Sequence, residues 1–225
     1  MPEANLHEHS PQLLHHFAEA EQQREASSFG MWVFLVTEIM FFGGVFCCYA
    51  AYRLRYLPSF EAGSRLLDVR LGATNTAVLI ASSLTMALAV HAAQTGKRKA
   101  LIAFLLVTMV LGVTFLGIKY TEYAHKWEDF LIPGIRFAPT EALPSGVTLP
   151  NLQLFFCFYF ILTGLHALHM IIGLGLLGFL VGKALRGRFS AEYFTPVEVS
   201  GLYWHFVDIV WIFLFPLLYL IGGRY

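Results

Sequence analysis

Five long apolar runs constrain the fold of this 225-residue chain more than any other feature of its sequence. A transmembrane α-helix needs about 20 predominantly apolar residues to cross the hydrocarbon core of a bilayer. Each run meets this length and is continuously apolar, whereas the strands of a transmembrane β-barrel alternate over about ten residues. The sequence therefore predicts an all-α bundle of five transmembrane helices, at about residues 29–52, 73–94, 100–123, 152–182 and 200–222.

The composition agrees with a membrane protein. Hydrophobic residues make up 57% of the chain and charged residues 13%, whereas soluble domains carry about 25% charged residues. The formal net charge is zero, so nothing indicates a nucleic-acid partner. We therefore divide the chain into a polar segment, residues 1–28, and a five-helix domain, residues 29–225.

The polar N-terminal segment lacks the apolar stretch of a secretory signal peptide. It is rich in histidine, and His-rich tracts can bind metal. We favour instead a flexible or docking segment. The histidines concerned are His7, His9, His15 and His16.

The connecting loops predict how the helices are arranged. The turn TGKRK at 95–99 is short, so the second and third helices are expected to be antiparallel neighbours. This turn and the loop at 182–196 are densely basic, and basic loops remain in the cytoplasm. We therefore predict a cytoplasmic N-terminus and a periplasmic C-terminus. The proline-containing stretch 124–151 is predicted to be an irregular surface loop, and Asn75 with Thr76 to begin the second helix.

Ionisable residues inside the apolar runs are the strongest clues to function, because such residues are rare and costly in membrane helices. Glu38 lies in FLVTEIMFFGG, roughly 14 Å along the first helix. His166 and His169 share one face of the fourth helix, and His205 and Asp208 share one face of the fifth. A charge at this depth costs at least about 2.5 kcal/mol. We therefore expect these residues to form a buried hydrogen-bonded network, with Glu38 paired to one of the histidines His166, His169 or His205.

Three interpretations of this network remain open. Paired histidines can ligate a metal or a haem, but a bis-histidine haem needs histidines that face each other across a gap. Glutamate, histidine and aspartate also suit a proton or ion pathway in an independent transporter, but the sequence shows no inverted repeat. The third interpretation, which we favour, is a structural network that fixes helix packing.

The chain resembles subunit III of the haem–copper oxidases, the family of cytochrome c oxidase and its quinol-oxidase relatives. The resemblance covers the whole membrane part, with the matching segments in family order. They are GMWVFLVTEIMFFGG at 30–44, NTAVLIASSLTMALA at 75–89, TGKRKALIAFL at 95–105, LGVTFLGIKYTEY at 111–123, LTGLHALHMIIG at 162–173 and EVSGLYWHFVDIVWIFLF at 198–215.

The resemblance implies a non-redox accessory subunit without catalytic residues or metal of its own. The partners would be the catalytic subunit I, which holds haems and one copper, and subunit II, which in some members holds a further copper. The three cysteines are too scattered for a paired-cysteine copper loop; they are Cys47, Cys48 and Cys157. The implied role is to pack on subunit I, bind phospholipid and sustain proton uptake.

Six residues coincide with family positions. Glu38 matches the intramembrane glutamate, and Lys183 stands where some members place an arginine that meets a lipid phosphate. A lysine offers a point charge there but not the bidentate fork of arginine. The remaining matches are the paired histidines and the WHFVD motif, at His166, His169, His205 and Asp208.

The long mitochondrial form of this family has seven helices, and the present chain begins at the equivalent of the third. Five-helix versions resemble those of bacterial complexes, so the resemblance implies a bacterial inner membrane. Such versions occur in cytochrome c oxidases and quinol oxidases, and beside nitric oxide reductases. The choice among these enzymes stays open at this point.

Overall fold

The computed structural model describes residues 20–134, 137–139, 144 and 146–222. The N-terminal histidines lie outside these residues. Within the described chain there are six helices, five of them long and apolar enough to cross a membrane, which confirms the predicted all-α bundle. The helices are α1 (Ala20–Arg55), α2 (Leu57–Arg65), α3 (Val69–Gln94), α4 (Arg98–Glu128), α5 (Leu149–Leu185) and α6 (Thr195–Tyr219).

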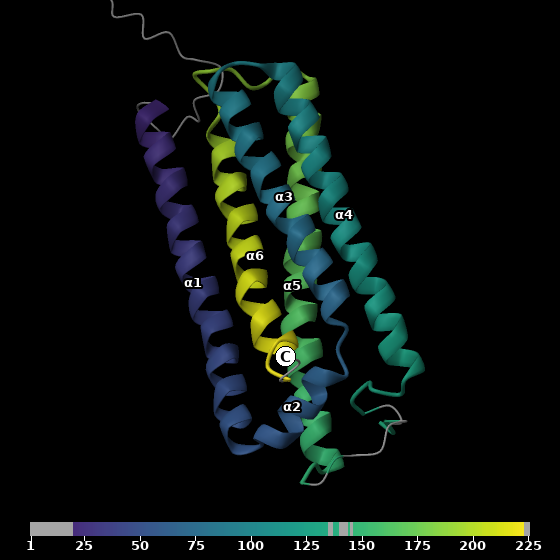
Figure 1. Cartoon of the computed structure of the whole chain (residues 1–225). Coiled ribbons are helices and arrows are strands. Elements are labelled where there is room, and N and C mark those ends of the chain that lie inside the picture. Colours follow the sequence, from purple (N-terminus) through teal and green to yellow (C-terminus); the bar gives the residue numbers. More distant parts are fainter. Residues whose placement is uncertain (1–19, 135–136, 140–143, 145, 223–225) are drawn as a thin grey trace, which may run out of the picture.

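The five long helices run side by side, with α3, α5 and α6 between α1 and α4 (Figure 1). The tight turn after α3 places α4 antiparallel to it, as predicted. Gly96 has a φ of 67°, a conformation that glycine adopts without steric cost. The Lys97 N–H then donates to the Ala92 carbonyl at 2.9 Å, which closes the turn.

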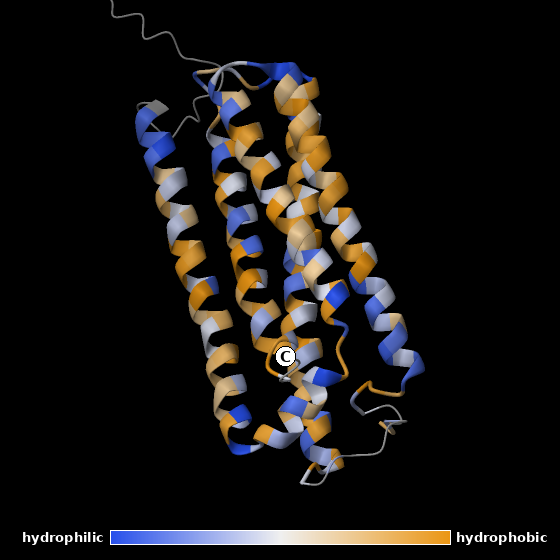
Figure 2. Ribbon diagram, viewed as in Figure 1, coloured by the Kyte–Doolittle hydropathy of each residue, from blue (hydrophilic) through white to orange (hydrophobic). Residues whose placement is uncertain are grey.

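Hydropathy separates the bundle into an apolar middle and more polar ends (Figure 2). Large apolar side chains are exposed along the long helices, including Leu84, Ile161 and Phe179. Helices satisfy their backbone hydrogen bonds internally, so such side chains can face hydrocarbon at no polar cost.

The short helix α2 is absent from the predicted helices. It begins at Leu57 with Pro58 in its first turn, and it buries Phe60 and Gly63. A Cβ on Gly63 would stand 2.3 Å from the Phe155 ring, so α2 approaches α5 closely. Its mixed composition gives no transmembrane signal, and only its packing reveals it.

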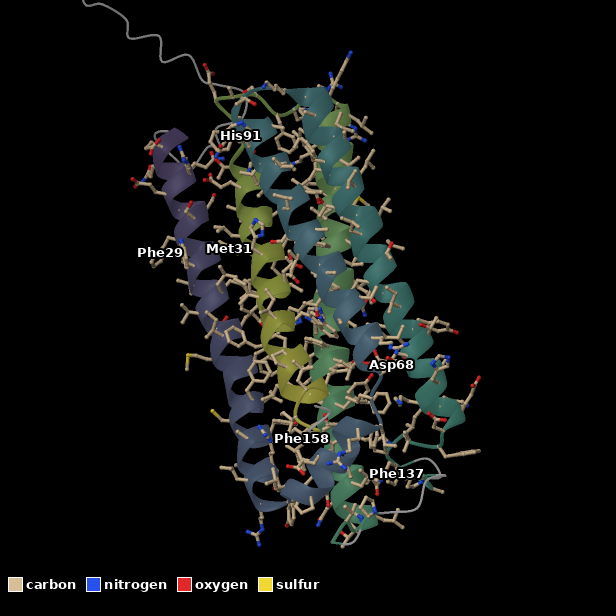
Figure 3. The ribbon with its side chains drawn as sticks, in the orientation of Figure 1. Phe29, Met31, Asp68, His91, Phe137 and Phe158 are labelled. Atoms are coloured by element: carbon tan, nitrogen blue, oxygen red, sulfur yellow. The ribbon has the colours of Figure 1, made fainter. Side chains whose placement is uncertain are left out.

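The predicted start of the second transmembrane helix was wrong. Asp68 caps α3 instead, and its side chain accepts from Arg70 N at 2.8 Å and Leu71 N at 3.3 Å. Asn75 lies inside the helix and is fully buried. In Figure 3, Asp68 and His91 mark the two ends of this helix. The first helix likewise extends beyond its predicted start, because the chain is already helical at Ala20.

Helix α1 lies at the edge of the bundle and contacts it through one narrow stripe. Its fully buried side chains, Leu35, Phe42 and Tyr49, recur every seven residues. This spacing keeps one seam of a helix against its neighbours. Phe29 points away from the bundle and is 72% exposed (Figure 3). Glu38 falls between Leu35 and Phe42 on the buried seam, so the fold turns it inward.

The indole of Trp204 fills the centre of the bundle. Its Nε1 donates to Ser82 Oγ of α3 at 2.9 Å. A Cβ added to Gly112 of α4 or to Gly173 of α5 would stand 2.9 Å from the indole ring. Trp204 of α6 therefore contacts α3, α4 and α5. The glycines on α4 and α5 let these two helices approach the indole closely.

Candidate functional site

Glu38 of α1 pairs with His169 of α5, one of the three histidines predicted for it. Glu38 Oε2 lies 3.1 Å from His169 Nε2. His169 Nδ1 lies 2.8 Å from the Leu165 carbonyl oxygen. A carbonyl oxygen only accepts, so Nδ1 carries a proton and donates it.

With Nδ1 protonated, the hydrogen bond between His169 Nε2 and Glu38 Oε2 needs one further proton. Nε2 either accepts from a protonated Glu38 or donates as part of an imidazolium to the carboxylate. Both states place one proton between Glu38 and His169, and both make the pair neutral overall. A neutral pair avoids the cost of an isolated carboxylate in the membrane, which accounts for the glutamate inside FLVTEIMFFGG.

The pair lies near the surface of the bundle, since the side chain of Glu38 is 20% exposed and that of His169 is 12% exposed. Phe42 packs against the His169 ring at a centroid distance of 5.3 Å. Tyr203 of α6 donates to the backbone carbonyl of His169 at 3.0 Å. The site thus joins α1, α5 and α6 and can hold a proton, but it presents little open space.

His166 lies elsewhere, although it shares a helix with His169. It is 1% exposed, and its ring packs against Phe115 and Trp211 at centroid distances of 5.2 and 5.1 Å. Neither ring nitrogen has a hydrogen-bond partner within the described chain. His166 is therefore a core side chain among aromatic rings and is not joined to the Glu38 pair by a hydrogen bond.

His205 and Asp208 belong to a third location, between α6 and α3. His205 Nδ1 lies 2.7 Å from the hydroxyl of Ser83. Asp208 is 3% exposed and lies beside the same hydroxyl. Neither carboxyl oxygen has a hydrogen bond of standard geometry within the described residues. The five predicted network residues are therefore divided among three places rather than joined in one network.

The described residues also bear on a metal site and on the lipid contact predicted for Lys183. Among the described residues, no three histidine, cysteine, aspartate or glutamate side chains gather as a metal site. Lys183 lies near the end of α5, with Nζ 4.5 Å from the centre of the Phe179 ring. Its predicted contact with a lipid phosphate stays a prediction.

A buried ion pair in α4 was not recognised as a site from the sequence. Lys119 Nζ lies 3.0 Å from Glu122 Oε2, and these residues are 3% and 1% exposed. Lys119 also donates to the hydroxyls of Tyr159 and Tyr219, at 3.2 and 3.0 Å. Both hydroxyls donate to Glu122 Oε1, at 3.0 and 2.6 Å. The cluster ties α4 to α5 and α6, and its signal in the sequence is the Lys–Glu spacing in KYTE.

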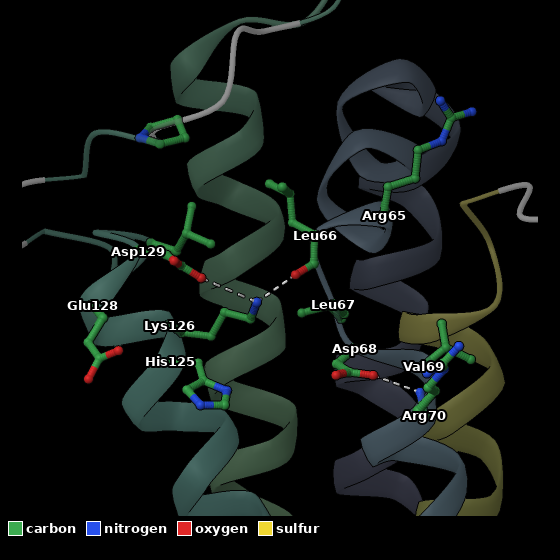
Figure 4. A pocket seen from close by; sticks show the side chains of 12 residues that line it. Arg65, Leu66, Leu67, Asp68, Val69, Arg70, His125, Lys126, Glu128 and Asp129 are labelled. Carbon is green, nitrogen blue, oxygen red and sulfur yellow. Dashed lines mark hydrogen bonds and ion pairs between the residues drawn. The ribbon is translucent and has the colours of Figure 1, made fainter.

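A charged pocket of about 770 Å³ lies where the start of α3 faces the end of α4 (Figure 4). Lys126 Nζ donates to the Leu66 carbonyl at 2.5 Å and lies 3.9 Å from Asp129 Oδ2. Acidic and basic side chains both line the pocket, so its charge selects neither anions nor cations.

Comparison with known proteins identifies the family. The protein family described as cytochrome c oxidase subunit III matches residues 14–133 and 140–223 of this chain. The quinol oxidase subunit 3 of Bacillus subtilis is 31% identical over 198 residues, covering 86% of this chain and 86% of the relative. The cytochrome bo(3) ubiquinol oxidase subunit 3 of Pseudomonas aeruginosa is 31% identical over 195 residues, covering 87% and 85%.

A longer relative matches as well. The cytochrome c oxidase subunit 3 of Loxodonta africana is 30% identical over 208 residues, covering 89% of this chain and 71% of the relative. The family match extends across all the long helices of the described bundle. This chain therefore belongs to the cytochrome c oxidase subunit III family of haem–copper oxidase subunits.

Proposed function

We propose that this chain is the non-redox, accessory subunit of a bacterial terminal oxidase that reduces oxygen and pumps protons. In this proposal the haems and copper belong to subunits I and II, and no catalytic residue belongs to this chain. The chain stabilises the catalytic subunit, binds phospholipid and supports proton uptake. The observation that carries the proposal is the match to subunit 3 proteins of oxidases over about 86% of both chains.

The geometry supports a scaffold more than a centre of chemistry. The Glu38–His169 pair holds its proton in an internal bond, and His166 is surrounded by aromatic rings. Lys119 and Glu122 engage each other and two tyrosines. Each group is thereby committed to contacts between helices, as a rigid supporting subunit requires.

Two electron donors are candidates for the assembled enzyme. Relatives are named as subunits of cytochrome c oxidases and of quinol oxidases. Cytochrome c is the first candidate. The match covers 86% of the bacterial quinol oxidase relative but 71% of the Loxodonta africana cytochrome c oxidase relative, and this difference favours quinol as the second candidate. Oxygen consumption by the purified complex with reduced cytochrome c, and separately with a quinol, distinguishes the two donors.

We also propose that the membrane is the bacterial inner membrane, with the N-terminus inside and the C-terminus outside. The basic turn at 97–99 and the basic residues after α5 lie at the same end of the bundle as the start of α1 (Figure 1). Positive charge of this kind remains cytoplasmic. Alkaline phosphatase fused after residue 225 is expected to be active, and the same enzyme fused after residue 97 inactive.

The accessory role is tested by comparing the purified oxidase with and without this chain. We expect the complex that lacks it to keep its haem absorption spectrum, because no ligand is removed. We also expect its oxygen consumption to decline faster during continuous turnover, because proton uptake is less well supported. Loss of haem on removal of the chain, or an unchanged decline, would contradict the proposal.

A further inference from the structure

A groove between α3 and α6 ends in an unsatisfied polar group. The groove has a volume of about 410 Å³ and opens among exposed apolar side chains, including Leu84 and Ile209. Asp208 lines it although only 3% of the residue is exposed, so its carboxyl group lies at the floor. The Ser83 hydroxyl lies beside this carboxyl group but is also bonded to His205, and neither carboxyl oxygen has a hydrogen bond of standard geometry within the described chain. Buried polar groups are almost always hydrogen-bonded. One shared hydroxyl cannot fill the acceptor sites of two carboxyl oxygens, so Asp208 has room for a further hydrogen-bond donor.

The depth of the groove restricts what that partner is. Asp208 lies roughly 20 Å along α6, and Ser83 lies roughly 21 Å along α3, so both stand near the midpoint of their helices. Lipid headgroups begin about 15 Å from the middle of the bilayer, because the hydrocarbon core is about 30 Å thick. An acyl chain reaches this depth but offers no hydrogen bond. A helix that crosses the membrane reaches it with a polar side chain.

The α3 wall of the groove also suits a helix. Ser83 and Ala87 both line the groove and lie four residues apart, the spacing at which small side chains let two helix backbones approach closely. Ser83 Oγ lies 2.7 Å from His205 Nδ1, and this hydrogen bond joins α3 to α6 along the groove. The apolar rim provides van der Waals contact around the polar floor, which Ser83, His205 and Asp208 form.

We propose that this groove seats a transmembrane helix of another oxidase subunit and that a hydrogen-bond donor on this helix bonds to Asp208. The inference rests on the proposed function, because it requires assembly with other membrane subunits. It assigns the α3–α6 face to that assembly. The outer face of α4 carries exposed apolar side chains but no unbonded buried polar atom among the described residues, so it serves as the control face.

Photocrosslinking tests the location. p-Benzoylphenylalanine is placed at Leu84, on the rim of the groove, in the complete oxidase in its native membrane. The matched control carries it at Leu106, which is 46% exposed on α4. We expect a covalent adduct with another oxidase subunit from position 84 and lipid adducts from position 106. Lipid adducts alone from position 84, or the same protein adduct from both positions, would overturn the proposal.

Substitutions test the two features of the groove. Ala87→Trp fills it, and Ala103→Trp places the same side chain on the exposed surface of α4. Asp208→Leu removes the acceptor, whereas Asp208→Asn keeps one carbonyl oxygen. We expect Ala87→Trp and Asp208→Leu to lower the amount of chain retained on the tagged catalytic subunit about three- to tenfold. Ala103→Trp and Asp208→Asn are expected to be retained like the unmodified chain.

The controls separate this inference from the proposed function. Circular dichroism of each purified variant checks that the helices are intact. If a variant is misfolded, its retention is not interpreted, and the crosslinking from positions 84 and 106 tests the groove instead. If the unmodified chain is not retained on a haem-bearing subunit, the proposed function fails. If the unmodified chain and all four variants are retained equally, only the assignment of the groove fails.

Discussion

Glu38 shows at the scale of one residue how a charged side chain is accommodated in a membrane helix. Its partner His169 has its other ring nitrogen engaged with the Leu165 carbonyl, so the pair shares a single proton. The apolar surroundings and the i, i+3 histidines predicted a pairing from the sequence. The choice of His169 over His166 was not predictable, because it depends on the rotation of α5 and on the aromatic rings around His166.

We expect Glu38→Gln to preserve the pairing, because an amide N–H can donate to His169 Nε2. Glu38→Leu leaves that nitrogen unpaired and is expected to lower the free energy of unfolding by about 1 kcal/mol. The measurement is unfolding of the chain in mixed micelles with increasing SDS. Thr37→Val, at an exposed position on the same helix, serves as the control and is expected to have little effect. Haem spectra of the complex should be unchanged by either Glu38 variant.

The Lys119–Glu122 pair is expected to show strong coupling. Lys119→Met leaves the buried Glu122 carboxylate without its cation, and the loss of one partner of a buried ion pair costs about 3–5 kcal/mol. The double variant Lys119→Met, Glu122→Leu leaves no unpaired charge, so we expect it to lose much less than the sum of the single variants. Unfolding free energies of the two single variants and the double variant measure this coupling. Additive losses would show that the two side chains act independently.

The same pair shows a limit of sequence interpretation. The third helix was predicted to end at residue 123, which placed Lys119 and Glu122 at its boundary, but α4 continues to Glu128. The two tyrosines that complete the cluster come from α5 and α6. The spacing in KYTE indicates the Lys119–Glu122 pair, but no local pattern connects the pair to tyrosines so distant in the sequence, so their part in the cluster becomes evident only from the packing.

Helix α1 packs against the rest of the bundle through a single seam of side chains, and two adjacent phenylalanines test its orientation. Phe42 is 3% exposed and packs against the bundle, whereas Phe41 is 49% exposed. We expect Phe42→Ala to lower the unfolding free energy by about 3 kcal/mol, because it leaves a cavity beside His169. Phe41→Ala, the matched control, should cost much less. Equal effects would mean that α1 is rotated away from the described orientation.

Packing around Trp204 provides a second test at this scale. Gly173→Ala brings a methyl group to 2.9 Å from the indole, so we expect a loss of about 1–3 kcal/mol. Gly175→Ala, two residues along the same helix, meets nothing within 4 Å and should be neutral or slightly stabilising. Thermal unfolding of the detergent-solubilised chain compares the two variants. A neutral Gly173→Ala would contradict the close approach of α5 and α6.

For the whole molecule, the apolar runs predicted the number and type of the long helices, because the bilayer sets their length. The ends were less predictable, since helices continue into the polar boundary until a cap or a turn stops them, as Asp68 and Gly96 do. The short α2 and the division of the polar residues among three places depend on tertiary contacts. The sequence motifs nevertheless indicated the family that the comparisons show.

We propose that this chain supports a haem-bearing enzyme and carries no haem of its own. The most direct measurement is affinity purification of the tagged full-length chain from mild detergent, with an absorption spectrum of the product. We expect a haem spectrum that accompanies the chain and separates from it once the complex is dissociated. A stable, isolated chain without a haem-bearing partner, or haem that remains on the chain after dissociation, would contradict the account.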